Sequence, residues 1–383
     1  MSAGFTLSED QQIILDAADR YGRERLAPLA RRMDDEEWWP DEAFRALGRE
    51  GYLGITVPTE LEGAGLDLFA SGLVLQGFSR WNYALGLSWV AHENLCLNNI
   101  LRNGSREQIE RYIPGLSNGT LIGCLGLTEP GAGSDAFGSM RTTARRVGDE
   151  YVLNGQKTFI TNAPYADLFV VYAKLEEDGE RSIQPFLVER GTPGLETSKP
   201  FRKMGMHAAP TGAVYLDEVR VPKDHLLGGG VRERGHVKAR LADERAGMPT
   251  LSLGLADRAF EIARNYALER EQFGQPIANF QLVQRRLARM YALLCNMRNF
   301  VFLDFLSGRR VPRTVAEISA GKLYCCEAAT QITLEAIHIL GGNGYMEEYE
   351  VERLARDAKL LELGGGTTEI QELTIARELV GRR

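Results

Sequence analysis

Apolar residues recur at the spacing of α-helices through the first part of the chain, residues 1–122. Ser8 and Gln11 have the spacing of a capping box, in which each side chain bonds to the backbone of the other residue. Ile14 and Tyr21 then fall on one helical face. The pattern therefore predicts a helical N-terminal region.

The period shortens between residues 123 and 228, where turn residues multiply. Asn154-Gly155 is a residue pair typical of a two-residue hairpin turn, and short apolar stretches flank it. Further stretches rich in Val, Leu, Tyr and Phe are typical of strands, and they cover Leu168 to Ala173, Phe186 to Val188 and Ala213 to Val221. We expect a compact β domain here, with a hairpin at 154–155.

After three consecutive glycines, Gly228 to Gly230, the helical period returns and continues to the C-terminus. The long periodic runs cover about 233–269, 280–306 and 313–340. The last of them is broken at Gly341-Gly342. The order helical, β, helical predicts an α+β protein. We expect its domains at 1–122, 123–228 and 229–383.

The composition narrows the class of protein. The chain has 383 residues, of which 44% are hydrophobic and 25% charged, as in ordinary globular proteins. Its net charge of -7 argues against a nucleic-acid partner. No apolar run is long enough to span a bilayer, and the N-terminus lacks the pattern of a signal peptide. Five scattered cysteines without metal-ligand spacing indicate reduced thiols. We therefore expect a cytoplasmic protein with no metal site and no membrane contact.

A glycine-containing loop, Leu125 to Asp135, carries the first candidate chemistry. Gly131 and Gly133 allow a ligand to approach the backbone closely, and Thr128 and Ser134 supply hydroxyl groups. Taken alone, the loop is better explained as a connection between a strand and a turn.

Five ordered blocks over most of the chain resemble the acyl-CoA dehydrogenase family. They are the loop just described, Gly155 to Asn162, Arg270 to Gln281, His338 to Tyr345 and Ala358 to Gln371. The stretch Ala91 to Ile100 is most similar to the isovaleryl-CoA dehydrogenase branch. The resemblance implies the fold of that family, with an N-terminal helical domain, a middle β-barrel-like domain and a C-terminal four-helix bundle.

The resemblance also implies FAD as the cofactor. The first two blocks assign to it Leu125, Leu127, Thr128, Gly133, Ser134, Phe159, Ile160 and Thr161. The later blocks assign Arg270, Phe273, Gln281, His338, Gly341, Gly342, Gly366, Thr367 and Glu369. In the family, the aromatic residue at 159 packs on the flavin, and the arginine at 270 binds the pyrophosphate of a neighbouring subunit's FAD. Because glutamine is usual at position 338, a purely structural role for this histidine stays open.

The last block contains Gly364-Gly365-Gly366, and most family members have their catalytic glutamate where this chain has Gly365. Removing a proton from carbon needs a base. In the isovaleryl branch the base lies in a Leu-Asp-x-Glu-Arg-like motif, which Leu241 to Arg245 resembles, so the resemblance implies Glu244. The alternative is a solvated charge cluster at these positions. Gly365 retains the backbone N–H that, in the family, polarises the thioester carbonyl.

The substrate residues implied by the resemblance are Leu95, Ser134, Asp243, Arg245 and Gly364. Many straight-chain enzymes have tyrosine at 364, so glycine there implies room for a branched or bulky acyl group. A glycine that serves only the turn is the alternative. Departures from the family pattern leave the acyl group and the thioester carrier open, and they occur at His207, Gly235 and Ala242.

The resemblance implies an FAD-dependent α,β-dehydrogenation of a short or branched acyl-CoA by a homotetramer. Glu244 would remove the α-proton, the β-hydride would pass to flavin N5, and an electron-transfer flavoprotein would accept the electrons. A second hypothesis is the same fold with another reaction, such as that of an oxidase, a monooxygenase or a desulfinase. A third is a non-catalytic or nucleic-acid-binding member of the fold, against which the acidic balance counts.

Overall fold

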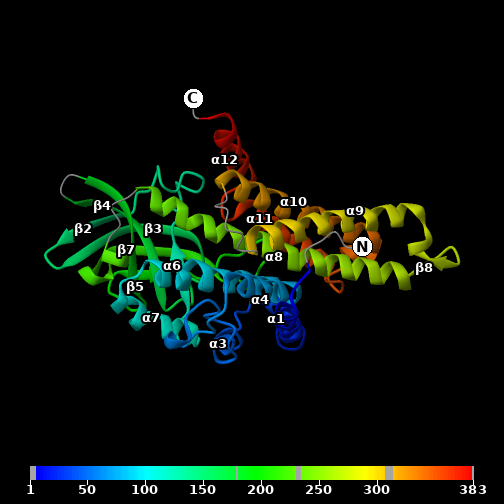
Figure 1. Ribbon diagram of the computed structural model, residues 1–383, viewed down its shortest axis with the longest axis horizontal. Coiled ribbons are helices and arrows are strands. Elements are labelled where there is room, and N and C mark those ends of the chain that lie inside the picture. The colour runs from blue at the N-terminus through cyan, green and yellow to red at the C-terminus, as the bar shows by residue number, and fades with distance from the viewer. Residues whose placement is uncertain (1–5, 178–179, 230–233, 307–313, 382–383) are drawn as a thin grey trace.

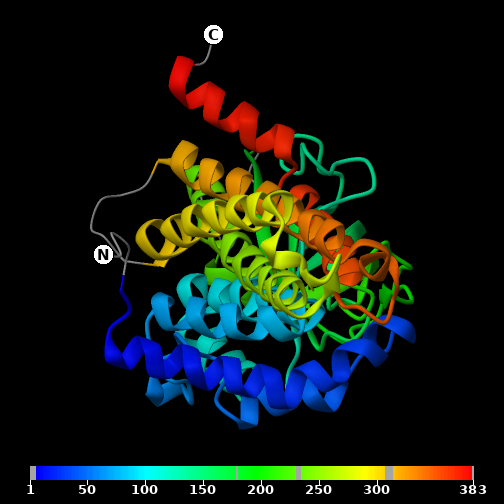
Figure 2. The ribbon, with the colours of Figure 1, turned by 90° about the vertical axis from the view of Figure 1, so that its right-hand side faces the viewer.

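The computed structural model describes residues 6–177, 180–229, 234–306 and 314–381. Figure 1 shows N-terminal helices along one side, a β-sheet at one end, and long C-terminal helices that run from the sheet to the other end. Figure 2 shows the N-terminal helices stacked against the C-terminal ones. The α+β organisation predicted from the hydrophobic pattern is confirmed.

The N-terminal part is helical, as predicted. Its elements are α1 (Glu9–Tyr21), η1 (Gly22–Leu26), α2 (Ala27–Asp35), α3 (Asp41–Arg49), η2 (Thr59–Leu61), α4 (Leu68–Trp81), α5 (Tyr83–Val90), η3 (Ala91–Leu97), α6 (Asn98–Asn103) and α7 (Arg106–Ser117). The capping box at α1 is present, since Gln11 N–H donates to Ser8 Oγ at 3.2 Å and Ser8 N–H donates to Gln11 Oε1 at 3.0 Å. Helix α4 packs against both α1 and α8, which explains why most of its residues are buried.

A seven-stranded mixed sheet forms the middle part. Its strands are β1 (Gly123–Gly126), β2 (Thr143–Val147), β3 (Glu150–Thr161), β4 (Leu168–Glu177), β5 (Glu180–Glu189), β6 (Leu195–Thr197) and β7 (Thr211–Pro222). The strand order is β1-β4-β2-β3-β7-β6, and β5 pairs with β4 as well. Strand β1 runs parallel to β4, and β3 runs antiparallel to β7. The three strand stretches predicted after residue 165 lie within β4, β5 and β7.

The hairpin predicted at Asn154-Gly155 is wrong. Strand β3 runs through both residues, and a bulge lies between Leu153 and Gly155. A Cβ on Gly155 would lie 2.5 Å from the Oγ1 atom of Thr142, so glycine is required by a close approach of two chain segments rather than by a turn. The hairpin turn forms between β2 and β3 instead, where Gly148 has a φ of 63°.

The C-terminal part is again helical. Its elements are η4 (Lys223–His225), η5 (Leu227–Gly229), α8 (Arg234–Glu269), β8 (Glu271–Gln272), β9 (Gln275–Pro276), η6 (Ile277–Asn279), α9 (Gln281–Arg298), η7 (Asn299–Leu306), α10 (Val315–Leu340), η8 (Gly341–Tyr345), α11 (Val351–Leu363) and α12 (Thr368–Val380). The three predicted long runs correspond to α8, to α9 with η7, and to α10. Helix α12 stands away from the body of the molecule (Figures 1 and 2) and exposes Leu379 and Val380.

The largest hydrophobic core joins the N-terminal helices to the C-terminal ones. Leu73 and Phe78 of α4 and Leu251 and Leu255 of α8 are all buried in it. A second core fills the interior of the sheet, and a third lies where α6 and α7 meet the sheet. Because burial of apolar surface is the main stabilising contribution, these cores fix α8 relative to the N-terminal helices.

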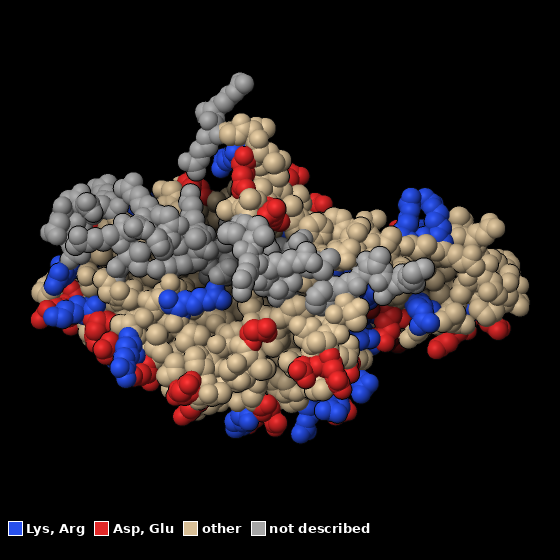
Figure 3. All heavy atoms as spheres, in the orientation of Figure 1, with Lys and Arg blue, Asp and Glu red and all other residues tan. Residues whose placement is uncertain are grey.

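On the face shown in Figure 3, acidic and basic side chains are interspersed along the lower edge rather than segregated. Across the part of the chain that the structure describes, none of the helices is long and apolar enough to cross a membrane. The same residues contain no cluster of three or more His, Cys, Asp or Glu side chains suited to a metal ion.

Candidate functional site

Phe159 is presented to the outside of the sheet by an irregularity in β3. The pairing of β3 with β7 is interrupted between Lys157 and Ile160, and Phe159 there has a φ of 58° and is 70% exposed. A positive φ is unfavourable for a bulky residue and is frequent at ligand sites. An exposed aromatic ring held in this way is suited to packing on a flat ligand such as a flavin.

The glycine loop beside Phe159 leaves room for a ligand. A Cβ on Gly131 or Gly133 would meet no atom of the described residues within 4 Å, and neither residue has a positive φ. Neither packing nor backbone conformation within this chain therefore requires glycine. A ligand lying against the backbone would require it, and the loop thus fits the cofactor that the sequence implies.

The structure corrects how two of the predicted cofactor residues could act. Leu125 and Ile160 are buried, Leu125 where the helices meet the sheet and Ile160 in the core of the sheet. Only their backbone atoms could face a ligand outside the sheet. Leu127, Thr128 and Thr161 are half-buried and Ser134 is exposed, so these side chains are accessible.

A second group of predicted cofactor residues lies at the opposite end of the molecule. The hairpin formed by β8 and β9, which holds Phe273, is far from the sheet in Figure 1. Phe273 is 92% exposed and has a φ of 51°. Asn343 of η8 donates to the hydroxyl of Tyr266 at 2.9 Å, and Arg270 N–H donates to the carbonyl of Tyr266 at 2.8 Å. The block from His338 to Tyr345, which contains Asn343, is therefore close to Arg270.

One chain does not bring all the predicted cofactor residues together. The residues at the distal end are Arg270, Phe273, Gln281, His338, Gly341 and Gly342. Gly366, Thr367 and Glu369 lie elsewhere again, at the start of α12. A single FAD could not contact the sheet and the distal end of the same chain, because the long C-terminal helices separate them (Figure 1).

The three glycines form the turn between α11 and α12. Gly365 and Gly366 have φ values of 65° and 95°, which favour glycine, whereas Gly364 has a φ of -71° and a ψ of 151°. The carbonyl of Gly366 accepts hydrogen bonds from Lys322 Nζ and, at 3.0 Å, from Gln371 Nε2. Backbone geometry thus explains glycine at 365 and 366 but not at 364.

Position 364 is also free of steric constraint. A Cβ there would meet only the carbonyl oxygen of Leu360, at 3.5 Å, among the described residues. The turn therefore does not by itself require glycine at 364, and room for a branched or bulky acyl group there stays a prediction. For Gly365 the positive φ is a sufficient reason.

Helix α8 passes directly by this turn. A Cβ on Gly365 would lie 3.6 Å from Met248 Cγ, and a Cβ on Gly247 would lie 3.0 Å from Asn94 Nδ2 of η3. The turn, α8 and η3 therefore converge. Leu95, half-buried in η3, is next to Asn94.

The predicted base and its neighbours lie in the N-terminal half of the same helix. Glu244 is one helical turn before Met248, and so is on the same face of α8. The side chains of residues 234–246 lie outside the part that the structure describes. For this reason Glu244, Asp243, Arg245, Ala242 and Gly235 are placed by the helix backbone alone.

Two buried carboxyl groups elsewhere could be mistaken for a base. Burial raises the pKa of Glu93 to about 7, although its two oxygens accept hydrogen bonds from Gly54 N–H at 2.9 Å and Ile55 N–H at 2.8 Å. Burial likewise raises the pKa of Asp357 to about 6, and this carboxylate accepts a hydrogen bond from Met206 N–H. Both groups fix backbone segments and face away from solvent, so neither is a candidate base.

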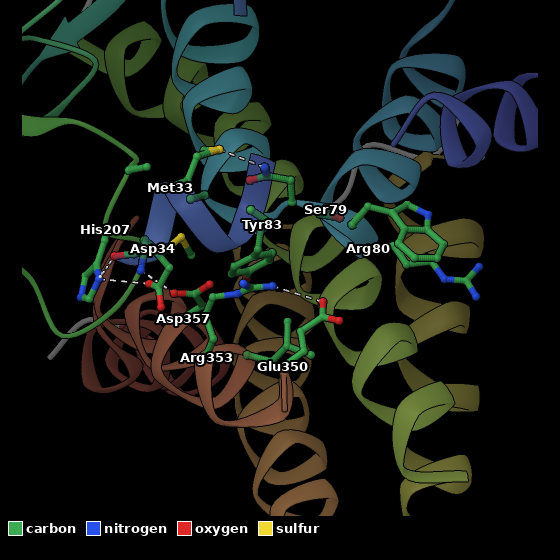
Figure 4. Close-up of a pocket in the computed structure, with 16 residues that line it drawn as sticks. Met33, Asp34, Ser79, Arg80, Tyr83, His207, Glu350, Arg353 and Asp357 are labelled. Carbon is green, nitrogen blue, oxygen red and sulfur yellow. Dashed lines mark hydrogen bonds and ion pairs between the residues drawn. The ribbon is translucent and has the colours of Figure 1, made fainter. Parts of the chain in front are cut away.

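A small pocket lies among α2, the start of α5, the segment before β7 and α11. At its edge His207 Nδ1 lies 3.0 Å from Asp34 Oδ1 (Figure 4). Arg356 also pairs with Asp34, at 2.6 Å. His207, one of the residues that depart from the family pattern, therefore joins the segment before β7 to the N-terminal helices. The residues that line this pocket belong neither to the glycine loop nor to the glycine turn.

Some site residues were not predicted from the sequence. Lys322 and Gln371, which bond to the glycine turn, and Met248, which faces it, are examples. Glu129 and Lys157 form a buried ion pair beneath the glycine loop. Glu129 and Lys157 lie in two neighbouring blocks that carry the resemblance. Their opposite charges were the feature of the sequence from which this ion pair could have been predicted.

Comparison with known proteins gives matches over nearly the whole chain. The models of the N-terminal, middle and C-terminal domains of acyl-CoA dehydrogenase match residues 8–120, 124–219 and 234–380. Mitochondrial isovaleryl-CoA dehydrogenase of Pongo abelii is 38% identical over 97% of this chain and 89% of its own length.

Two solved structures are similar throughout. A glutaryl-CoA dehydrogenase of Mycobacterium smegmatis in complex with FADH2 has a TM-score of 0.93 and 30% identity, covering 98% of this chain and 96% of that one. The prolyl acyl carrier protein oxidase AnaB has a TM-score of 0.92 and 32% identity, covering 98% and 100%.

Proposed function

The chain belongs to the acyl-CoA dehydrogenase family, and we propose that it is an FAD-dependent dehydrogenase of a short or branched acyl-CoA with Glu244 as its base. The observation that carries the proposal is the convergence of α8 on the turn at Gly365, where most of the family has its glutamate. Helix α8 is thus the element from which a replacement carboxylate could reach the same space.

FAD is the cofactor of this family, and when bound it accepts the hydride released from the β-carbon of the substrate. In this chain Phe159 would pack on the flavin, and Thr128, Ser134 and Thr161 would supply hydrogen bonds to it. The exposure of Phe159 and the unfilled space at Gly131 support this placement.

Glu244 would hold the α-proton after its removal from the substrate. Its place on α8, one turn from Met248, supports a position next to the glycine turn, because a carboxylate there shares the face of Met248. Enclosure by substrate and cofactor would raise the pKa of such a carboxylate toward neutrality, which suits a general base.

Gly365 would donate its backbone N–H to the thioester carbonyl oxygen as negative charge develops there. Such donors stabilise the transition state because they are already oriented before the reaction. The hydrogen bonds from Lys322 and Gln371 to the neighbouring carbonyl of Gly366 support a fixed orientation of the turn.

The acyl group would lie between Gly364, Leu95 and α8. Similarity to isovaleryl-CoA dehydrogenase and the unconstrained glycine at 364 support a branched or bulky acyl group. The decisive experiment is anaerobic bleaching of the flavin by a panel of acyl-CoAs. We expect faster bleaching by isovaleryl-CoA than by butyryl-CoA. Bleaching by none of the acyl-CoAs would contradict the proposed reaction.

We further propose that the protein is a homotetramer in which the distal end of one chain completes the FAD site of another. The separation of the two groups of cofactor residues supports this, and so does Phe273, a ring left almost fully exposed in the single chain. The molar mass in solution, measured by light scattering, should be four times that of the 42.6 kDa chain. A monomer with a full complement of FAD would exclude the proposal.

A second candidate function is that of an oxidase acting on a carrier-protein thioester. The similar structure of AnaB, which is named a prolyl acyl carrier protein oxidase, favours this candidate. The two functions differ in what reoxidises the cofactor. Slow reaction of the substrate-reduced enzyme with oxygen and fast reaction with an electron-transfer flavoprotein are expected for the dehydrogenase. The reverse result would favour the oxidase.

A further inference from the structure

The glycine loop and strand β3 are joined by a buried ion pair. Lys157 Nζ lies 2.8 Å from Glu129 Oε1, and the two side chains are 0% and 5% exposed. Each charge loses its hydration on burial, which is unfavourable unless the partner and further hydrogen bonds replace it. Burial raises the pKa of Glu129, but the hydrogen bonds from Lys157 and Thr142 outweigh it and bring the pKa below its usual value, so the carboxylate is ionised.

The other hydrogen bonds of the pair connect it to both ends of the glycine loop, at Leu127 before the loop and at Arg141 and Thr142 after it. Glu129 Oε1 accepts from Thr142 N–H at 2.9 Å and from Thr142 Oγ1 at 2.5 Å, and Glu129 Oε2 accepts from Arg141 N–H at 2.6 Å. Lys157 Nζ also donates to the carbonyl of Leu127 at 3.2 Å. The pair therefore fixes both the beginning and the end of the segment that contains Gly131 and Gly133.

The bond to Leu127 determines which way the next peptide group points. Because the C=O and N–H of a trans peptide point in opposite directions, a Leu127 carbonyl directed at Lys157 directs the N–H of Thr128 away from the ion pair. The carbonyl of Thr128 accepts from Thr158 N–H at 2.8 Å, which links the loop to β3 directly before Phe159. The hydrogen bonds of Leu127 and Thr128 to β3 thus fix the orientation of the Thr128 amide and the position of the Phe159 backbone together.

We propose that Glu129 and Lys157 are positioning residues for the flavin, which hold the Thr128 amide and the Phe159 ring in the geometry that binds it. The proposal rests on the placement of the flavin against this loop described above. Both side chains are buried behind the loop, so neither would touch the cofactor. Without the pair, the loop and the bulge of β3 would each be free to move relative to the other.

The test compares variants of the FAD-loaded enzyme. Lys157→Met removes the cation, and Glu129→Gln keeps the size of the side chain but removes its charge. We expect FAD to be released at least tenfold faster on dilution, measured by the rise in fluorescence of free FAD, and we expect the reduction potential of the bound flavin to shift. Lys157→Arg keeps the positive charge, so its rate of FAD release and its flavin reduction potential should lie closer to the wild-type values than those of Lys157→Met.

Two controls separate positioning from loss of stability. Lys223→Met breaks an exposed pair with Asp149 in the same domain, at 2.8 Å, and should change neither FAD release nor the potential. Val188→Ala truncates a residue buried in the core of the sheet and should lower the melting temperature without a comparable change in FAD release.

The proposal is overturned if Glu129→Gln lowers the melting temperature but releases FAD no faster than Val188→Ala and keeps the wild-type potential. If Lys157→Met cannot be purified, Glu129→Gln and Lys157→Arg decide the outcome. Failure of every acyl-CoA to bleach a firmly bound flavin would contradict the proposed reaction while leaving this inference intact.

Discussion

Replacing Glu244 by glutamine should give a yellow enzyme that retains FAD but is no longer bleached by acyl-CoA. Glutamine has nearly the shape of glutamate and cannot accept the α-proton. Loss of a general base typically slows a reaction by about 10²–10⁴-fold. The rate constant for anaerobic flavin reduction, measured by stopped-flow absorbance, should fall by that factor while the ratio of flavin to protein stays the same.

The matched control is Glu269→Gln at the exposed C-terminal end of the same helix. It removes one carboxylate from α8 far from the glycine turn, so flavin reduction should proceed at the wild-type rate. Bleaching of the Glu244→Gln variant at the wild-type rate would show that another group is the base.

Gly364→Tyr should reduce the use of branched substrates while leaving the fold intact. The backbone at 364, with a φ of -71° and a ψ of 151°, suits any L-residue, and a Cβ there meets only the Leu360 carbonyl at 3.5 Å. The phenol ring would fill the space that we assign to the branch of the acyl group. Since one extra or missing methylene group changes specificity by about 10–200-fold, kcat/KM for isovaleryl-CoA should fall by a factor in that range relative to butyryl-CoA.

Gly364→Ala provides the control for this change, because a methyl group at the same position leaves most of the space open. Its preference between the two substrates should stay close to that of the wild type. Equal losses for both substrates in the tyrosine variant would mean that position 364 does not border the branched part of the acyl group.

Much of the fold could be predicted from the hydrophobic pattern because long helices repeat their signal. The runs that became α8 and α10 are amphipathic or buried over many turns, and the capping box at Ser8 marks the start of α1. The hairpin at Asn154-Gly155 could not be predicted correctly because the same dipeptide also suits a bulge. The deciding contact of Gly155 is with Thr142, thirteen residues earlier in the chain, and it exists only in the folded sheet.

The candidate site was predictable only in part, for a similar reason. The resemblance assigned both Phe159 and Ile160 to the cofactor. The bulge in β3 instead turns Phe159 outward and Ile160 into the core of the sheet. The pattern could not show that Gly365 needs its positive φ whereas Gly364 does not. The ion pair between Glu129 and Lys157 likewise depends on the folded sheet, which brings together two residues from different motifs.

The location of Phe273 and the sheet at opposite ends of the chain has a consequence for mixtures of chains. If each cofactor site combines the glycine loop of one chain with the Arg270 end of another, two inactive variants can complement each other. A variant damaged at the Arg270 end would supply an intact glycine loop, and a variant damaged at the glycine loop would supply an intact Arg270 end. Cofactor retention then depends on protein concentration, because dilution that separates the chains also divides the site.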